Sequence, residues 1–315
     1  MQKIHQKLHL WYVQNGRHDL PWRKTEDPYH IYLSEVMLQQ TQVKTVLERY
    51  YFPFLEKFPT LQALADAPLD EVLKMWEGLG YYTRAKNLHK AAQIAAPELP
   101  RTYDGLLALP GIGKNTASAI CAFAYRQKRA VMEANVRRIL CRLYVLDDPK
   151  EDELIQKANA LLDNSNPFDY NQAMMDIGTM VCSFKNPLCC KCPFEEICQA
   201  RALGCYDFPV KKSRKVPTRK EIVVVEFYQQ KVKLIQREGR FLHGLWGFPS
   251  SDNAKGESIG EVRHQYTHFK LELSLFLFHC KEEKRNMFTR EEIEDLALST
   301  VDRKIVRLLE KRGLF

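Results

Sequence analysis

The stretch Leu109-Pro110-Gly111-Ile112-Gly113-Lys114-Asn115-Thr116-Ala117 decides the fold of this chain. Two glycines one residue apart predict a tight turn, because glycine tolerates a positive φ and a close approach of another backbone. The helix-forming run 117–122 follows, so free amides would stand at a helix start, where the macrodipole favours a phosphate. The pattern fits a helix-hairpin-helix that grips a DNA backbone without reading its bases. Taken alone, it fits an ordinary helix-turn-helix corner equally well.

Composition limits the class of protein. The chain has 315 residues, which suggests two domains, and 45% of its residues are hydrophobic, enough for a sizeable core. A net charge of +8 favours a polyanionic partner. No run approaches the roughly 18 unbroken apolar residues of a membrane helix, and the N-terminus has no apolar signal core. We therefore expect a cytoplasmic protein, nucleoid-associated in a bacterial cell, with no membrane partner.

The N-terminal part of the chain is predicted to be helical. Asp27-Pro28 is typical of a helix start, with a capping side chain followed by proline at the first helical position. From Tyr29 to about Tyr51 the apolar residues show no strand-like alternation, which favours helix. Proline or glycine separates many of the remaining segments. Further helices are expected at about 5–14, 61–66, 69–77, 82–95, 104–108, 115–125, 135–146, 151–163 and 168–180.

A second, α+β domain is expected beyond Cys205. The basic run at 210–220 is typical of a solvated linker, and it could also follow a phosphate backbone. β-Branched and aromatic residues predict strands at 222–225, 232–235 and 271–278, and the pattern returns to helix at about 291–311. We therefore expect a multidomain chain with an all-α domain at 1–208, a linker at 209–220 and an α+β domain at 221–315.

The cysteines indicate a metal site. Five of the nine cysteines fall between Cys182 and Cys198, and a chain without a signal peptide has little use for disulfides. Four of them have the spacing Cys182-x6-Cys189-x2-Cys192-x5-Cys198, which can hold zinc or a [4Fe–4S] cluster. Structural zinc sites typically pair two short knuckles and this loop has one, so the spacing favours the cluster in a structural role. The remaining cysteines are interpreted as bystanders: Cys121, Cys141, Cys190, Cys205 and Cys280.

Together, the hairpin and the cysteine loop resemble the endonuclease III superfamily of DNA glycosylases. Within it, Ser34-Glu35-Val36-Met37-Leu38-Gln39-Gln40-Thr41-Gln42-Val43 resembles the signature of the MutY-type adenine DNA glycosylases. Residues 78–82 and 171–178 are similar to the same branch. The resemblance spans about 17–200 and continues more weakly beyond. It implies an all-α helix-hairpin-helix glycosylase domain with an iron-sulfur cluster loop, followed by a C-terminal α+β Nudix-like domain.

Glu35 is the candidate general acid. It lies at helical spacing from Ile31 and Leu38, and an apolar neighbourhood raises the pKa of a carboxyl so that it can hold a proton at neutral pH. Cleavage of an N-glycosidic bond needs that proton for the departing base, and a second carboxylate for the oxocarbenium-like sugar. Without the family resemblance, a glutamate on a solvated helix face would be the simpler interpretation.

Glu133 is the candidate second carboxylate. The resemblance implies an aspartate here, in the context Asp-Gly-Asn-Val, whereas this chain has Glu133-Ala134-Asn135-Val136. Glutamate keeps the charge but is one methylene longer, and it is a poorer N-cap for the helix expected near Asn135. A catalytic group misplaced by about 1 Å can cost on the order of a hundredfold in rate. We favour a working catalytic Glu133; the alternative is a residue that only caps the helix in a slow enzyme.

The resemblance also assigns the base pocket. Asn115 stands where bifunctional relatives that also nick the strand have a Schiff-base lysine, so a monofunctional glycosylase is expected. The adjacent Lys114 points elsewhere, because one residue turns a helix by about 100°. The adenine pocket and its support are expected to comprise Trp22, Arg23, Asn115 and Asp176, although Trp22 could equally be a core residue.

The target base must leave the stack before an acid can reach it, and the resemblance implies that Gln40 and Tyr81 insert into the duplex near the mismatch. Tyr81 follows Gly78 and Gly80 in an expected loop, which favours exposure over core packing. The full set of expected DNA contacts is Gln40, Thr41, Leu79, Gly80, Tyr81, Gly111, Gly113, Lys114 and Asn135.

The C-terminal domain is expected to recognise rather than to hydrolyse. The stretch 243–249 resembles the loop of a Nudix-like fold, but no run of Arg-Glu and paired glutamates follows it. In adenine glycosylases this domain contacts 8-oxoguanine through a Phe-Ser-His turn, and the matching stretch here is Tyr266-Thr267-His268. A lone histidine in a strand turn is more often structural, so the resemblance alone carries this assignment.

The resulting hypothesis is a monomeric, monofunctional adenine DNA glycosylase. Its expected partner is double-stranded DNA that contains A:8-oxoguanine or A:G mispairs, and its expected cofactor is a [4Fe–4S] cluster. One alternative is a thymine-mismatch or oxidised-pyrimidine glycosylase of the same superfamily, although such relatives generally lack the C-terminal domain. A second alternative is a catalytically weak lesion-binding protein, which only the departure at Glu133 supports.

Overall fold

The computed structural model describes residues 1–210, 216–239 and 241–315, which form two compact units. The first unit comprises Met1–Val46, Phe58–Ala65 and Lys90–Ser213. The second comprises Leu47–Lys57, Asp66–His89 and Arg214–Phe315. Residues 211–215 of the expected linker lie outside the described residues, and β1 already begins at Thr218.

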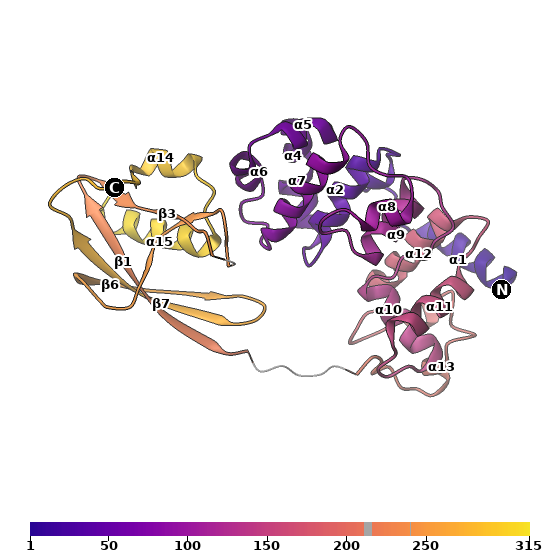
Figure 1. The fold of residues 1–315 in the computed structure, drawn as a ribbon. Coiled ribbons are helices and arrows are strands. Elements are labelled where there is room, and N and C mark those ends of the chain that lie inside the picture. The colour runs from indigo at the N-terminus through magenta and orange to yellow at the C-terminus, as the bar shows by residue number, and fades with distance from the viewer. Residues whose placement is uncertain (211–215, 240) are drawn as a thin grey trace. The chain divides into compact units, whose positions relative to one another are not determined.

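The first unit is helical, as predicted (Figure 1). Its helices are α1 (Gln2–Asn15), α2 (Pro28–Leu38), α8 (Tyr103–Leu107), α9 (Lys114–Phe123), α10 (Ala134–Tyr144), α11 (Glu151–Leu161), α12 (Pro167–Met180) and α13 (Gln199–Ala202), with 3₁₀ turns η1 (Pro21–Arg23) and η2 (Cys189–Lys191). Three more helices, α3 (Val43–Arg49), α5 (Leu61–Asp66) and α7 (Thr83–Ala95), cross the boundaries between the units.

The predicted start of α2 is confirmed. The Asp27 carboxylate accepts a hydrogen bond from the backbone amide of Tyr29 at 2.8 Å, and Pro28 occupies the first helical position. The helical segment expected at 29–51 is wrong as a continuous element, because α2 ends at Leu38. The chain turns there through Gln40, whose φ is 57°, before α3 begins. No glycine or proline marks that break in the sequence.

Two helices, α9 and α12, organise the core of the first unit. Ile31 of α2 packs with Ala119, Ala122 and Phe123 of α9 in one apolar cluster. In a second cluster α12 packs against α1 and α10, through residues such as Ala173 and Ile177. The first unit therefore holds α2, α9 and α10 in contact with neighbours that lie far away in the sequence.

The helix-hairpin-helix is present as α8, a turn and α9. Thr102 caps α8 by accepting a hydrogen bond from the Gly105 amide at 3.2 Å. Gly111 has a φ of 76°, which favours glycine, and the Ile112 amide donates to the Leu109 carbonyl at 3.2 Å. Gly113 is the N-cap of α9 and has no side chain to satisfy the first amides of the helix.

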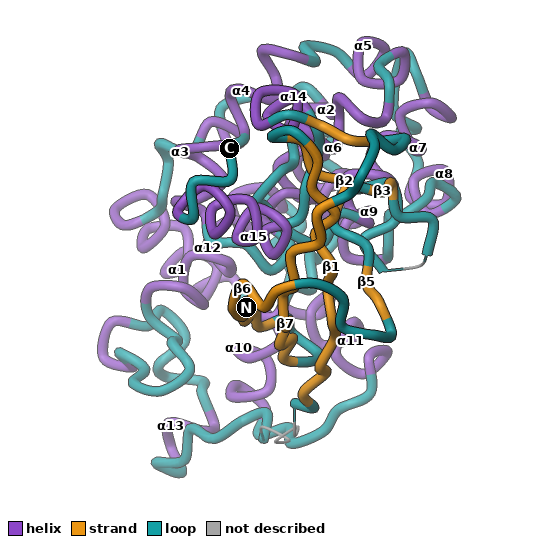
Figure 2. The backbone as a smooth tube through the Cα atoms, turned by 90° about the vertical axis from the view of Figure 1, so that its left-hand side faces the viewer, coloured by secondary structure: helices purple, strands orange, loops and turns teal. Residues whose placement is uncertain are grey.

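The C-terminal part of the second unit is α+β, as predicted. The strands of the main sheet follow the order β6-β7-β1-β2-β8, in which β1 pairs with β7 in parallel and β6 with β7 antiparallel. Figure 2 shows the strands of this domain in orange. These strands are β1 (Thr218–Tyr228), β2 (Lys231–Lys233), β6 (Glu257–Gln265), β7 (Lys270–His279) and β8 (Met287–Phe288); β5 (Ser250–Ser251) pairs with β1, and β3 (Ile235–Gln236) pairs with β4 (Trp246–Gly247).

The helix expected at 291–311 is two helices, α14 (Arg290–Asp295) and α15 (Thr300–Lys311). The chain breaks between them because Ser299 caps α15, accepting a hydrogen bond from the Asp302 amide at 3.2 Å. Ile305 and Leu309 of α15 are fully buried with Val225 and Leu275 of the sheet.

The second unit also contains α4 (Tyr51–Lys57) and α6 (Leu69–Met75). Pro53 is tolerated in α4 because it lies in the first turn, where its missing amide has no intrahelical partner. No helix in the described ranges is long and apolar enough to cross a membrane.

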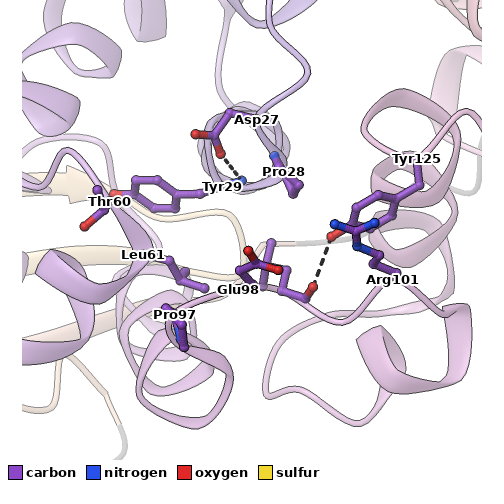
Figure 3. A pocket seen from close by; sticks show the side chains of 10 residues that line it. Asp27, Pro28, Tyr29, Thr60, Leu61, Pro97, Glu98, Arg101 and Tyr125 are labelled. Carbon is purple, nitrogen blue, oxygen red and sulfur yellow. Dashed lines mark hydrogen bonds between the residues drawn. The ribbon is translucent and has the colours of Figure 1, made fainter.

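A cavity of about 320 Å³ lies at the N-terminal end of α2, lined by residues such as Asp27, Glu98 and Arg101 (Figure 3). One wall is closed by Tyr125, whose hydroxyl donates to the Leu99 carbonyl at 3.1 Å. Glu35 lies seven residues beyond Pro28, roughly 10 Å further along the helix axis. This cavity is therefore separate from the surroundings of Glu35.

Candidate active site

Glu35 lines a small cavity of about 50 Å³ near the C-terminal end of α2. Apolar side chains such as Leu20, Ile31 and Phe123 form much of its wall. Burial and the nearby Glu133 charge raise the pKa of Glu35 to about 7, against the opposing effect of the Arg23 charge. A carboxyl in this state can keep a proton at neutral pH, which is what a general acid requires.

Glu133 is the N-cap residue of α10, but its side chain makes no capping hydrogen bond. Its Oε2 accepts a hydrogen bond from the Asn135 side-chain amide at 3.3 Å, and in the described part of the chain its Oε1 is buried without a partner. Burial also raises the pKa of Glu133, although the nearby amides of Asn135 and Val136 lower it. Glu133 thus occupies the N-cap position of α10 with one carboxylate oxygen left unpartnered in the described residues, an arrangement compatible with a capping role and with a catalytic role.

Asn135, expected to contact DNA, lies between Glu133 and Arg138. The Arg138 guanidinium donates to the Asn135 side-chain oxygen at 2.7 Å, to the Gly178 carbonyl at 2.5 Å and to the Cys182 carbonyl at 2.8 Å. Asn135 can therefore orient its amide toward Glu133, because its oxygen is already held by a cation. The same arginine ties the start of α10 to the end of α12 and to the cysteine loop.

Gly178 in α12 makes room for the start of α10. A Cβ atom at this position would lie 2.4 Å from the Asn135 Cβ, a distance that real Cβ atoms do not show. We predict that Gly178→Ala displaces Asn135 and with it Glu133, and slows base excision by about ten- to a hundredfold, because catalytic groups tolerate little misplacement. Single-turnover excision kinetics would check this.

The control for that measurement is Gly239→Ala, since a Cβ at Gly239 would meet nothing within 4 Å. It should excise at the wild-type rate. A wild-type rate in Gly178→Ala would show that the contact with Asn135 does not hold the catalytic geometry.

Arg23 and Asp176 form a buried ion pair behind the pocket. The two Arg23 terminal nitrogens donate to the two Asp176 oxygens at 2.7 and 2.9 Å, and Arg17 adds a contact of 2.7 Å from its Nε. Burial alone would raise the pKa of Asp176, but the hydrogen bonds and charges of Arg23 and Arg17 hold it below its usual range. Asp176 thus positions Arg23; both Arg17 and Arg23 line the cavity, and Asp176 does not.

Four further residues show where the sequence-based prediction was incomplete. Trp22 is buried and lines the cavity, so the core and pocket interpretations both hold. Gln172 and Met175 of α12 also line it and were not predicted. The sequence did contain one signal for Gln172, a polar residue four positions before Asp176, because positions four apart share a helix face. Asn115 does not line this cavity, but its Oδ1 is buried and unpartnered within the described ranges.

The expected DNA contacts on the hairpin and after α2 are accessible. Gly111, Gly113 and Lys114 are exposed, as is Gln40, while Thr41 is half-buried. A Cβ at Gly113 would meet no described atom within 4 Å, so packing within the described residues does not require glycine there.

In the second unit, Gly78, Gly80 and Tyr81 all have positive φ, and the Tyr81 side chain is 40% exposed. The Trp76 indole holds this loop by donating to the Gly80 carbonyl at 3.1 Å. Leu79 is only 6% exposed, so its side chain packs inside the unit. A DNA contact from Leu79 could come only from its backbone.

Tyr266-Thr267-His268 forms the turn between β6 and β7, closed by a hydrogen bond from the Tyr266 amide to the Phe269 carbonyl at 2.9 Å. Thr267 and His268 are exposed at its tip. Tyr266 packs against Phe241 and Phe269, at ring-centroid distances of 5.1 and 4.9 Å, and burial raises its pKa to about 12. The turn and Tyr81 line a common cavity of about 440 Å³ in this unit.

Cys182, Cys189, Cys192 and Cys198 line one cavity in the first unit. The Arg142 guanidinium is buried beside it and donates to the Cys182 sulfur at 3.4 Å and to the carbonyls of Ser183 and Phe184. In the described ranges, no three His, Cys, Asp or Glu side chains stand close enough to hold a single metal ion. The donor set and the shared cavity nevertheless fit a group with several metal atoms.

Comparisons with known proteins agree with this geometry. Residues 33–163 match the model of the HhH-GPD superfamily of base excision DNA repair proteins, and residues 222–308 match that of the NUDIX domain. The chain is 32% identical to the adenine DNA glycosylase of Homo sapiens, over 95% of this chain and 72% of the human protein. It is 34% identical to the adenine DNA glycosylase of Buchnera aphidicola subsp. Schizaphis graminum, over 84% of each chain. The chain belongs to the adenine DNA glycosylase family.

Solved structures support the same fold for the helical part of this adenine DNA glycosylase family member. A thermostable thymine-DNA glycosylase is similar with a TM-score of 0.59 and 26% identity, over 64% of this chain and 98% of that one. Endonuclease III in a complex with DNA matches with a TM-score of 0.54 and 20% identity, which shows the fold alone. Adenine DNA glycosylases match this chain across both domains, so the thymine-specific alternative is not favoured.

Proposed function

We propose that this chain is a monofunctional DNA glycosylase that removes adenine opposite 8-oxoguanine or guanine in double-stranded DNA. The observation that carries the proposal is the pair of carboxyls, Glu35 and Glu133, which are buried near each other and both have a raised pKa. Membership of the adenine DNA glycosylase family supports the substrate class.

In the proposed reaction Glu35 donates its proton to the adenine as the N-glycosidic bond breaks, and the bonding electrons leave with the base. The sugar becomes an oxocarbenium-like cation, which the Glu133 carboxylate stabilises. Water then adds to the sugar carbon, and its released proton restores the starting charge of the pair. Like charges close together favour one shared proton, which is the distribution that this division of roles requires.

Trp22, Arg23 and Gln172 would bind the extruded adenine, because they line the cavity with Glu35. Arg23 has an Nε that is buried and unpartnered among the described residues, so a donor is available for a base nitrogen. The cavity is smaller than a purine, so we expect its side chains to move apart as the base enters. Asn115 provides no amine for a Schiff base, which supports a monofunctional enzyme.

The remaining DNA contacts divide between the two units. In the first unit, the hairpin at Gly111–Lys114 would bind phosphate through free helix-start amides, and Gln40 would insert into the duplex. In the second unit, Tyr81 would insert, and the exposed tip at Thr267 and His268 would contact 8-oxoguanine. Left-handed backbone at Gln40 and Tyr81 supports these assignments, because strained conformations concentrate at functional sites.

The experiment that tests this function is single-turnover adenine release from duplexes that differ only in the base opposite adenine. We expect release from A:8-oxoguanine and A:G but not from A:T, with strand scission only after alkali. In the double variant Thr267→Ala/His268→Ala, the ratio of the excision rates opposite 8-oxoguanine and opposite guanine should fall about tenfold. The reason is that loss of a hydrogen-bonded base contact costs about 1–3 kcal/mol.

The matched control for the turn is Glu282→Ala, which lies on an exposed loop of the same domain. It should keep the wild-type preference. An unchanged preference in the turn variant would remove the turn from base recognition and leave the excision activity itself in place.

We further propose that Cys182, Cys189, Cys192 and Cys198 hold a [4Fe–4S] cluster. The cluster would supply covalent anchoring of the 182–198 loop rather than a step of the reaction. The shared cavity and the Arg142 contacts around it support this assignment. In the purified protein we expect about four iron atoms per chain.

The Cys192→Ser variant tests the ligand assignment, and Cys190→Ser is its control, since Cys190 is exposed and does not line the cavity. We expect iron to be lost in the first variant and retained in the second. Zinc instead of iron in the wild type would assign the same thiolates to a structural zinc site.

A further inference from the structure

The segment between α9 and α10 delivers Glu133 to the active site, yet it contains no helix or strand from Ala124 to Glu133. Its position must therefore be set by contacts with its neighbours. Val131, two residues before Glu133, is 1% exposed and anchors the segment in the apolar cluster with Ile31 and Phe123.

One side chain holds the backbone of this segment. Asn171 of α12 is 1% exposed, and its Oδ1 accepts a hydrogen bond from the Val131 amide at 2.9 Å. Its Nδ2 donates to the Arg129 carbonyl and to the Pro167 carbonyl, each at 2.8 Å. A side-chain amide is suited to this task, because it combines an acceptor with two donors at one end of a short side chain.

The same helix touches the catalytic segment on its other side. Gly178, seven residues beyond Asn171, packs against Asn135 and accepts a hydrogen bond from Arg138. Glu133 thus lies between two contacts with α12: Val131, two residues before it, contacts Asn171, and Asn135, two residues after it, contacts Gly178. Between Asn171 and Gly178, α12 contributes Gln172 and Met175 to the cavity that Glu35 lines.

We propose that Asn171 is a positioning residue for the reaction: by binding the backbone at Arg129 and Val131 it sets the place of Glu133 relative to Glu35. This inference rests on the catalytic role proposed for Glu133. Asn171 does not line the cavity and acts only through the segment that it holds.

The test uses the full-length chain with Asn171→Asp, which keeps the acceptor for Val131 but replaces the donors by a carboxylate that faces two carbonyls. Asn171→Ser is a second variant, which shortens the side chain without adding charge. For both we expect single-turnover excision to slow by about ten- to a hundredfold, as for a displaced catalytic group, with duplex affinity within about threefold of wild type.

Asn166→Ala is the matched control. Asn166 caps α12 by accepting a hydrogen bond from the Asp169 amide at 3.3 Å, so its loss weakens the same helix without touching the catalytic segment. Thermal unfolding of all three variants identifies a temperature at which each is folded. At that temperature the control should excise at the wild-type rate, and a control as slow as Asn171→Ser would reduce the role of Asn171 to helix stability.

A double variant separates positioning from general damage. If Asn171 acts through Glu133, then Asn171→Asp should slow the Glu133→Gln enzyme little further, because the group that it positions is already gone. An equal loss in both backgrounds, or a wild-type rate in Asn171→Asp, would overturn the proposal. A wild-type rate in Glu133→Gln alone would instead overturn the proposed role of Glu133.

Discussion

Glu35→Gln should lower the single-turnover rate of adenine excision by about 10²–10⁴-fold, the range attributed to general acid catalysis. Glutamine has nearly the same shape, so the cavity around position 35 is kept, but it has no acidic proton to give to the departing base. Duplex affinity should remain close to wild type. Glu56→Gln, at an exposed position of α4, is the control and should be fully active.

The pH profile gives a second readout of the same group. Burial raises the pKa of Glu35 to about 7, and the acid must be protonated to act, so its contribution is present below that pH and is lost as the pH rises through it. The excision rate of the wild type should fall about tenfold per pH unit above about 7. A rate that stays flat from pH 6 to about 9 would show that Glu35 is not the proton donor.

Glu133→Gln should slow excision on the order of 10²–10³-fold, the usual cost of removing one preorganised electrostatic contact to a transition state. The side chain would still accept from Asn135 through its oxygen, so the loss should be in the chemical step and not in duplex binding. Single-turnover rates and affinities measured on the same A:8-oxoguanine duplex check this split.

Glu133→Asp tests the length of the side chain, because it restores the residue that the family resemblance implies. A slower Asp variant would mean that the backbone of this chain is matched to glutamate. An inert wild type that binds tightly, together with an active Asp variant, would contradict the proposed enzyme and support the alternative of a lesion-binding protein.

Features that depend on neighbouring residues were predictable. The start of α2 follows from Asp27 and Pro28, because an N-cap side chain and a fixed proline φ act within one turn. The hairpin around Gly111 and the four-cysteine loop were likewise visible as spacings. The break after Leu38 was not, because Gln40 adopts a left-handed conformation that its residue type does not favour, and only the surrounding fold can impose it.

The roles of the residues that support the site could also not be predicted from the sequence. Gln172, Asn171 and Gly178 belong to one stretch that resembles the family, but their roles differ. Gln172 lines the cavity, Asn171 binds the backbone of Val131, and Gly178 leaves space for Asn135. Asn135 was expected to touch DNA, and its hydrogen bond to Glu133 was not predicted. Asn171 acts on Val131, which lies 40 residues away in the sequence. Gly178 makes room for Asn135 of α10.

The sequence by itself determined the fold class and predicted the division into domains and the two candidate carboxyls, because local patterns and motifs that resemble a family carry this information. The tertiary structure alone decided what those carboxyls can do. Burial by α2, α9 and α12 and the approach of Glu133 raise the pKa of Glu35 into the neutral range. Desolvation and charge proximity are properties of space rather than of sequence spacing, so only the folded chain could supply them.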